Sequence, residues 1–110
     1  MDFLKMDFSK LFLEKHGKSV YDEICIKIKS EAPTKYNEEY LEIIFKIAFF
    51  AYLGMDDTQI KKFLKHINNI DNVNITNIKN VHKKSIKEIQ KYVKIATNHN
   101  HPFTGGLFFP

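Results

Sequence analysis

The sequence contains a single cysteine, Cys25, and this scarcity limits how the chain can be held together. One thiol excludes an internal disulfide and the zinc sites that use two or more cysteine ligands. Free cysteines are most often buried as small apolar side chains, and we expect the same of Cys25. Stability must therefore come from packing, for which ten Phe and five Tyr supply large rings.

Arginine is absent, so all seventeen basic residues are lysines. Arginine presents a planar fork that recognises guanine or a carboxylate through two hydrogen bonds, whereas lysine acts as a compact charge. Contacts with nucleic acid would therefore fall mainly on phosphates. The abundance of Lys, Asn and Ile also indicates an AT-rich genome, which fits phages, plasmids and low-GC bacteria as well as some eukaryotes.

No apolar run is long enough to cross a membrane. The longest, residues 43–53, contains Lys46 and falls far short of the roughly 20 residues that a spanning helix needs. Residues 1–17 carry three acidic side chains and lack the charge pattern of a secretory signal. We therefore expect a cytoplasmic protein that has no membrane partner.

Common catalytic motifs are also missing. The sequence has no glycine-rich phosphate loop, no HExxH helix and no GxSxG nucleophile turn. His99 and His101 have a spacing that two metal ligands could share in an extended strand, but no third ligand is near them in the sequence. We therefore expect neither an enzyme nor a bound metal or other cofactor.

What is present over most of the chain is helical periodicity. Apolar residues recur at spacings of three and four in the segments 4–12, 20–28, 41–52, 60–67 and 75–96. Turn and capping residues separate these segments: Gly17, Pro33, Asn37, Gly54 and Asp56. The sequence predicts an all-α fold, a compact bundle of about five helices. In the second segment, apolar and polar residues alternate from Ile26 onward, a pattern that is also compatible with a short strand.

The third segment, residues 41–52, is apolar on nearly all sides. Such a helix is normally the buried centre of its domain, and we expect the other helices to surround it. The helical periodicity ends near residue 97, which predicts one domain over residues 1–97 and an irregular aromatic tail over residues 98–110. The rings of the tail are expected to dock on the domain or on a partner. They are Phe103, Phe108 and Phe109.

Charge is distributed unevenly along the chain. Residues 1–60 hold eight Lys and eleven acidic residues, a net charge of −3, whereas residues 61–110 hold nine Lys and two acidic residues, a net charge of +7. The last predicted helix separates an apolar stripe from a basic one, which consists of Lys79, Lys83, Lys84, Lys87, Lys91 and Lys94. His82 falls in the apolar stripe, and we expect it to be a hydrogen-bonded core residue.

Residues 40–95 resemble the tri-helical helix-turn-helix DNA-binding domains, especially those with a long final helix, as in the replication-initiator class. The resemblance rests on a buried helix ending Ala51-Tyr52-Leu53-Gly54, a short helix from Asp57, and a longer one opening Asn74-Ile75-Thr76-Asn77. It implies that residues at the start of the last helix approach a DNA groove. These residues are Asn74, Thr76, Asn77, Lys79 and Asn80.

A lysine stripe of this kind is often no more than the solvated face of a packed helix. Where such a basic helix binds a partner, two functions fit it. The first is a small DNA-associated accessory or regulatory protein of a phage or plasmid. The second is a small inhibitor or adaptor, such as a phage counter-defence protein, that places the same basic face on an acidic or nucleic-acid-binding protein. Both functions are compatible with a homodimer. In both, the binding residues would be Asn77, Lys79, Asn80, Lys83, Lys84, Lys87, Lys91 and Lys94.

Overall fold

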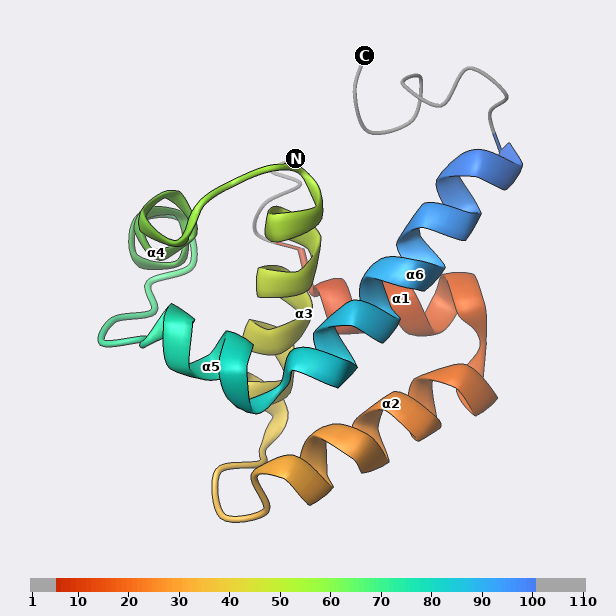
Figure 1. The fold of residues 1–110 in the computed structure, drawn as a ribbon, viewed down its shortest axis with the longest axis horizontal. Helices are drawn as coiled ribbons and strands as arrows, with labels where there is room; N and C mark the ends of the chain where they lie inside the picture. The colour runs from red at the N-terminus through yellow and green to blue at the C-terminus, as the bar shows by residue number, and fades with distance from the viewer. Residues whose placement is uncertain (1–5, 101–110) are drawn as a thin grey trace.

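The computed structural model describes residues 6–100, which form six α-helices and no strand (Figure 1). The all-α prediction is confirmed, and Ile26 lies within a helix. The aromatic residues Phe103, Phe108 and Phe109 lie outside the described residues, so the docking of the tail stays a prediction. The helices are α1 (Phe8–His16), α2 (Lys18–Glu31), α3 (Glu38–Tyr52), α4 (Asp57–His66), α5 (Ile75–Val81) and α6 (Lys83–Asn100).

Short polar side chains fix where most of these helices begin. Each accepts a hydrogen bond from the backbone N–H three residues later, which satisfies one of the free donors of the first turn. The residues are Asp7, Asn37, Asp56 and Asn74. α2 differs because it follows Gly17, whose φ of 93° lies in the region that favours glycine and lets the chain turn directly from α1.

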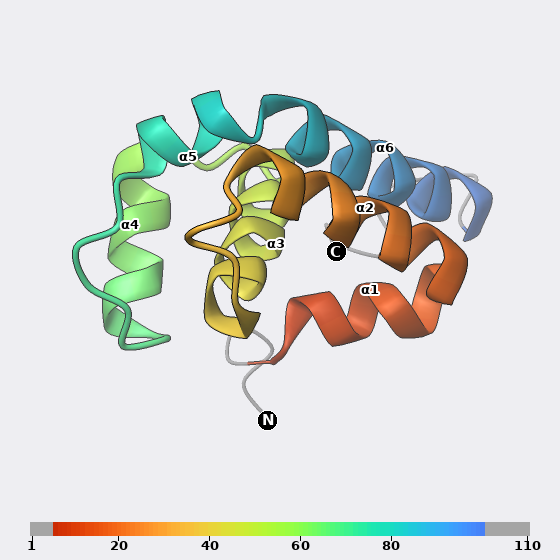
Figure 2. The ribbon, with the colours of Figure 1, turned by 90° about the horizontal axis from the view of Figure 1, so that it is seen from below.

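α3 supplies eight of the buried residues and packs against α1, α4, α5 and α6. Figure 2 shows α4 on one side of α3 and α1 on the other, with α5 and α6 lying across them. The buried side chains of α3 are spread around its axis. Within residues 6–100, no helix is at once long and apolar enough to cross a membrane.

Aromatic rings join α1 and α2 to α3. Phe45 lies 5.1 Å from Phe12 and 6.0 Å from Tyr21, measured between ring centroids. Phe8 packs edge-on against Phe50 at 5.5 Å. Offset and edge-on ring pairs of this kind add to the free energy gained from burial alone.

Cys25 is half-buried on α2, packed against the core, and is therefore more exposed than its residue type predicts. Burial raises the pKa of its thiol above the ordinary value. The protonated form is a poor nucleophile and a poor metal ligand. The structural role expected of this residue is thus consistent with its surroundings.

A largely buried carboxyl group on α3, that of Glu42, anchors the start of α1. The Glu42 carboxylate accepts hydrogen bonds from the backbone N–H groups of Phe8 at 2.6 Å and Ser9 at 2.8 Å. Lys46 Nζ lies 3.5 Å from Glu42 Oε2, and the Lys46 side chain is only 5% exposed. Burial raises the pKa of Glu42 to about 7, and the hydrogen-bonded Asp7 carboxyl acts in the same direction, against the two N–H donors.

Replacing Phe45 with alanine tests the core. Its ring is fully buried, so Phe45→Ala should lower the free energy of unfolding by about 3 to 5 kcal/mol. The control is Ile26→Ala, which shortens a side chain that is 68% exposed and should change stability by less than about 0.5 kcal/mol. Urea unfolding followed by circular dichroism measures both. Equal effects of the two changes would contradict this assignment of the core.

The anchor predicts a pH dependence of stability. Because Glu42 keeps its proton up to about pH 7 in the folded protein and loses it near 4.5 when unfolded, its contribution is complete below pH 4.5 and is lost as the pH rises to about 7. Between pH 5 and 8 the parent should therefore lose about 2 to 3 kcal/mol relative to Glu42→Gln. Urea unfolding at several pH values tests this. The exposed Glu38→Gln is the control, and parallel curves for the parent and Glu42→Gln would refute the prediction.

Candidate nucleic-acid interface

The long basic helix predicted over residues 75–96 is in fact two helices, α5 and α6, which meet at His82. His82 has φ −109° and ψ 29°, outside the helical range, and its ring is fully buried. The break therefore places the first part of the predicted helix on a separate axis. At its other end α6 continues to Asn100, whereas the sequence predicts that the helical domain ends at residue 97.

A hydrogen-bonded cluster explains why the chain breaks at His82. Its Nδ1 lies 2.7 Å from Glu31 Oε1, and its Nε2 lies 2.5 Å from the Tyr40 hydroxyl. The Ser85 hydroxyl donates to the same Glu31 oxygen at 2.7 Å. The cluster confirms that His82 is a hydrogen-bonded core residue. It also ties α2 and α3 to the start of α6.

The outer face of α6 carries five exposed lysines. At 100° per residue they fall within an arc of about 100°, opposite the arc of the buried residues Ser85, Ile86, Ile89 and Val93. No ion pair with another part of the described chain neutralises any of the five, because the pairs that form use other lysines. We call these residues the α6 lysine face: Lys83, Lys84, Lys87, Lys91 and Lys94.

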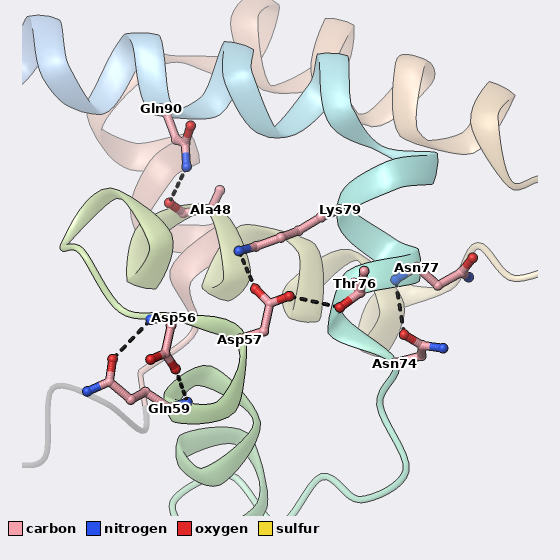
Figure 3. A network of polar contacts seen from close by, with 9 residues as sticks. All are labelled: Ala48, Asp56, Asp57, Gln59, Asn74, Thr76, Asn77, Lys79 and Gln90. Atoms are coloured by element: carbon pink, nitrogen blue, oxygen red, sulfur yellow. Dashed lines mark hydrogen bonds and ion pairs between the residues drawn. The ribbon is translucent and has the colours of Figure 1, made fainter.

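Two contacts fix the rotation of α6 about its axis. On the side toward α3, Gln90 Nε2 donates to the Ala48 carbonyl oxygen at 3.1 Å (Figure 3). On the side toward α2, Lys27 Nζ lies 3.1 Å from Glu88 Oε2. Both flank the α6 lysine face on the helical wheel, so the face is held toward solvent. Sequence analysis did not single out Gln90 or Glu88, because only their distant partners reveal their role.

Lys79 does not belong to this face, although the sequence places it in the basic stripe. It lies on α5, and its Nζ is 2.5 Å from Asp57 Oδ1 (Figure 3). The Thr76 hydroxyl donates to the other Asp57 oxygen at 2.8 Å. Together these bonds lower the pKa of Asp57 and hold the start of α4 against α5. The expected six-lysine stripe is thus a face of five lysines.

The residues that the helix-turn-helix resemblance assigns to a DNA groove divide into two groups. Thr76 and Lys79 bind Asp57, and the Asn74 side chain accepts the Asn77 N–H at 3.0 Å (Figure 3). The side chains of Asn77 and Asn80 are exposed. Most of the polar groups at the start of α5 therefore serve to hold the fold together.

Comparison with known proteins assigns no family: no protein-family model, no characterised sequence and no solved structure matches this chain.

His82→Leu tests the cluster that sets the path of α6. The change removes the partner of the Tyr40 hydroxyl and one of the two partners of Glu31, both partly buried, and it should lower the free energy of unfolding by about 2 to 4 kcal/mol. Ser85→Ala is the milder comparison, because Glu31 then keeps its bond to His82; about 1 kcal/mol is expected. Urea unfolding compares the two. A His82→Leu protein as stable as the parent would mean that the cluster does not determine the junction.

Proposed function

We propose that the protein binds the phosphate backbone of duplex DNA through the α6 lysine face and acts as a small accessory or regulatory protein of a phage or plasmid. The observation that carries the proposal is a set of five exposed lysines on one side of a helix whose rotation is fixed, none of them in an ion pair with residues 6–100. Their charge favours a polyanion, and the lack of arginine favours phosphates over base edges.

The dimensions of the face suit this ligand. From Lys83 to Lys94 the helix rises about 16 Å, and that length of duplex carries about nine phosphate charges. The duplex therefore offers more phosphate charges along this length than the face has lysines, so each lysine can contact a phosphate. Because each phosphate contact releases counterions, binding of this kind must weaken as salt is added.

Repulsion within the face also supports a binding role. Lys83, Lys87 and Lys91 follow one another at intervals of four residues, so their ammonium groups are neighbours on the helix surface. Each like-charge pair destabilises an isolated helix by about 0.2 to 0.5 kcal/mol. Phosphates bound along the face would neutralise this repulsion.

Replacing Lys83, Lys87 and Lys91 together with Gln tests the proposal. Five lysines limit the slope of log K against log salt to about −4.5, and the triple change should flatten the measured slope by about two to three units. Binding to unrelated duplex sequences should weaken alike. Fluorescence anisotropy over a salt series measures both quantities.

The matched control removes three lysines elsewhere: Lys10→Gln, Lys15→Gln and Lys35→Gln. These side chains are exposed on α1 and in the turn before α3, so the net charge falls equally while the α6 lysine face is untouched. The control should stay close to the parent. A triple α6 variant that binds duplex as tightly as the parent at every salt concentration would overturn the proposal. If the parent binds no duplex, the inhibitor or adaptor that uses the same face on a protein partner becomes the leading function.

A further inference from the structure

A second group of lysines lies on α4, away from the α6 lysine face. Lys61, Lys62 and Lys65 are all exposed, and no ion pair links them to other described residues. At 100° per residue they fall within an arc of about 100°, whereas Ile60 and Leu64 are buried on the other side of the helix. We call these three residues the α4 lysine face.

Among the described residues, the carboxylates at the start of α4 form no ion pair with these lysines. Asp57 is already bound to Lys79 and Thr76, which lowers its pKa. The Asp56 carboxylate accepts the Gln59 N–H at 2.9 Å, and the Asp56 N–H donates to Gln59 Oε1 at 3.0 Å, so this carboxylate is directed toward the helix start (Figure 3). The three lysines lie farther along α4, and Lys65 is in its last turn.

A shallow groove lies beside the α4 lysine face, between α4 and the segment that leads into α5. Lys61, Thr58, Asn72 and Asn74 line it together with Asp57, whose carboxylate is already paired with Lys79. Hydroxyl and amide groups of this kind commonly bind phosphate and sugar oxygens beside a lysine. The surface therefore resembles the α6 lysine face in charge and adds neutral hydrogen-bonding groups.

The two lysine faces point in different directions. α3 lies between α4 and α6 in both views (Figures 1 and 2). α4 buries Ile60 and Leu64 toward the core, and α6 buries Ile86 and Ile89 toward it from the other side of α3. The lysines of each helix lie on the outside. A straight duplex placed along one face therefore leaves the other face free.

From this arrangement we infer that the α4 lysine face is a second phosphate-binding surface and that one protein molecule bridges two duplex segments. The inference rests on the proposed binding of DNA by α6 and extends it to a role in holding two stretches of DNA together. Each surface binds through phosphates, so the two duplexes need not share a sequence.

A capture assay tests the bridge. A duplex of about 20 base pairs is immobilised, the protein is added at low salt, and capture of a second, fluorescent duplex of unrelated sequence is measured. The parent should capture the second duplex. Lys61→Gln, Lys62→Gln and Lys65→Gln together should reduce capture at least about fivefold while leaving the affinity for one duplex within about threefold. Sedimentation analysis should give one protein chain in the complex with two duplexes.

The variant that lacks Lys10, Lys15 and Lys35 is the control for lost charge and should capture the second duplex as the parent does. A parent that binds one duplex but captures no second one, or an α4 variant that captures normally, would overturn the bridge and leave DNA binding by α6 in place. Capture by two protein chains, one on each duplex, would also overturn it. If the α6 triple variant binds normally and the α4 variant does not, the proposed function of α6 fails and α4 is the DNA-binding surface.

Discussion

The inward position of His82 is the constraint on which the rest of the arrangement depends. A fully buried imidazole is stable only when its nitrogens are hydrogen-bonded, and the partners here are Glu31 and Tyr40, from α2 and α3. The three residues meet at the point where the chain turns between α5 and α6. That turn sends α6 across α2 and α3 as a helix of its own, and it leaves Lys79 behind on α5.

A second polar site, on another side of α3, works in a comparable way. Glu42 and Lys46 lie on α3, buried against the start of α1, and the carboxylate binds backbone donors that the first turn of α1 leaves free. Apolar contacts alone would allow α1 to rotate or slide on α3, because they are non-directional. The directional bonds of Glu42 select one position for α1.

Interactions between residues close in the sequence made much of the fold predictable. The features that were not predicted depend on contacts between residues far apart in the sequence. The caps at Asn37 and Asp56 and the apolar spacing of α3, α4 and α6 act within a few residues, so the sequence displays them directly. The break at His82 depends on Glu31 and Tyr40, which are 51 and 42 residues away. Lys79 shows the same limit for the site, because periodicity finds its place on a helix face but not its ion pair with Asp57.

The same reasoning separates lysines that hold the fold from lysines free to bind. Those near acidic side chains in the folded chain, such as Lys46 and Lys79, are used internally, and the structure satisfies them at short range. The first 60 residues hold most of the acidic side chains, yet the lysines of α6 lie on the outside and pair with no acidic residue in the part of the chain that the structure describes. Their mutual repulsion is relieved only by an anion from outside. Any ligand that binds only the folded state shifts the folding equilibrium toward that state. A polyanion bound to the α6 lysine face would therefore also stabilise the folded α6.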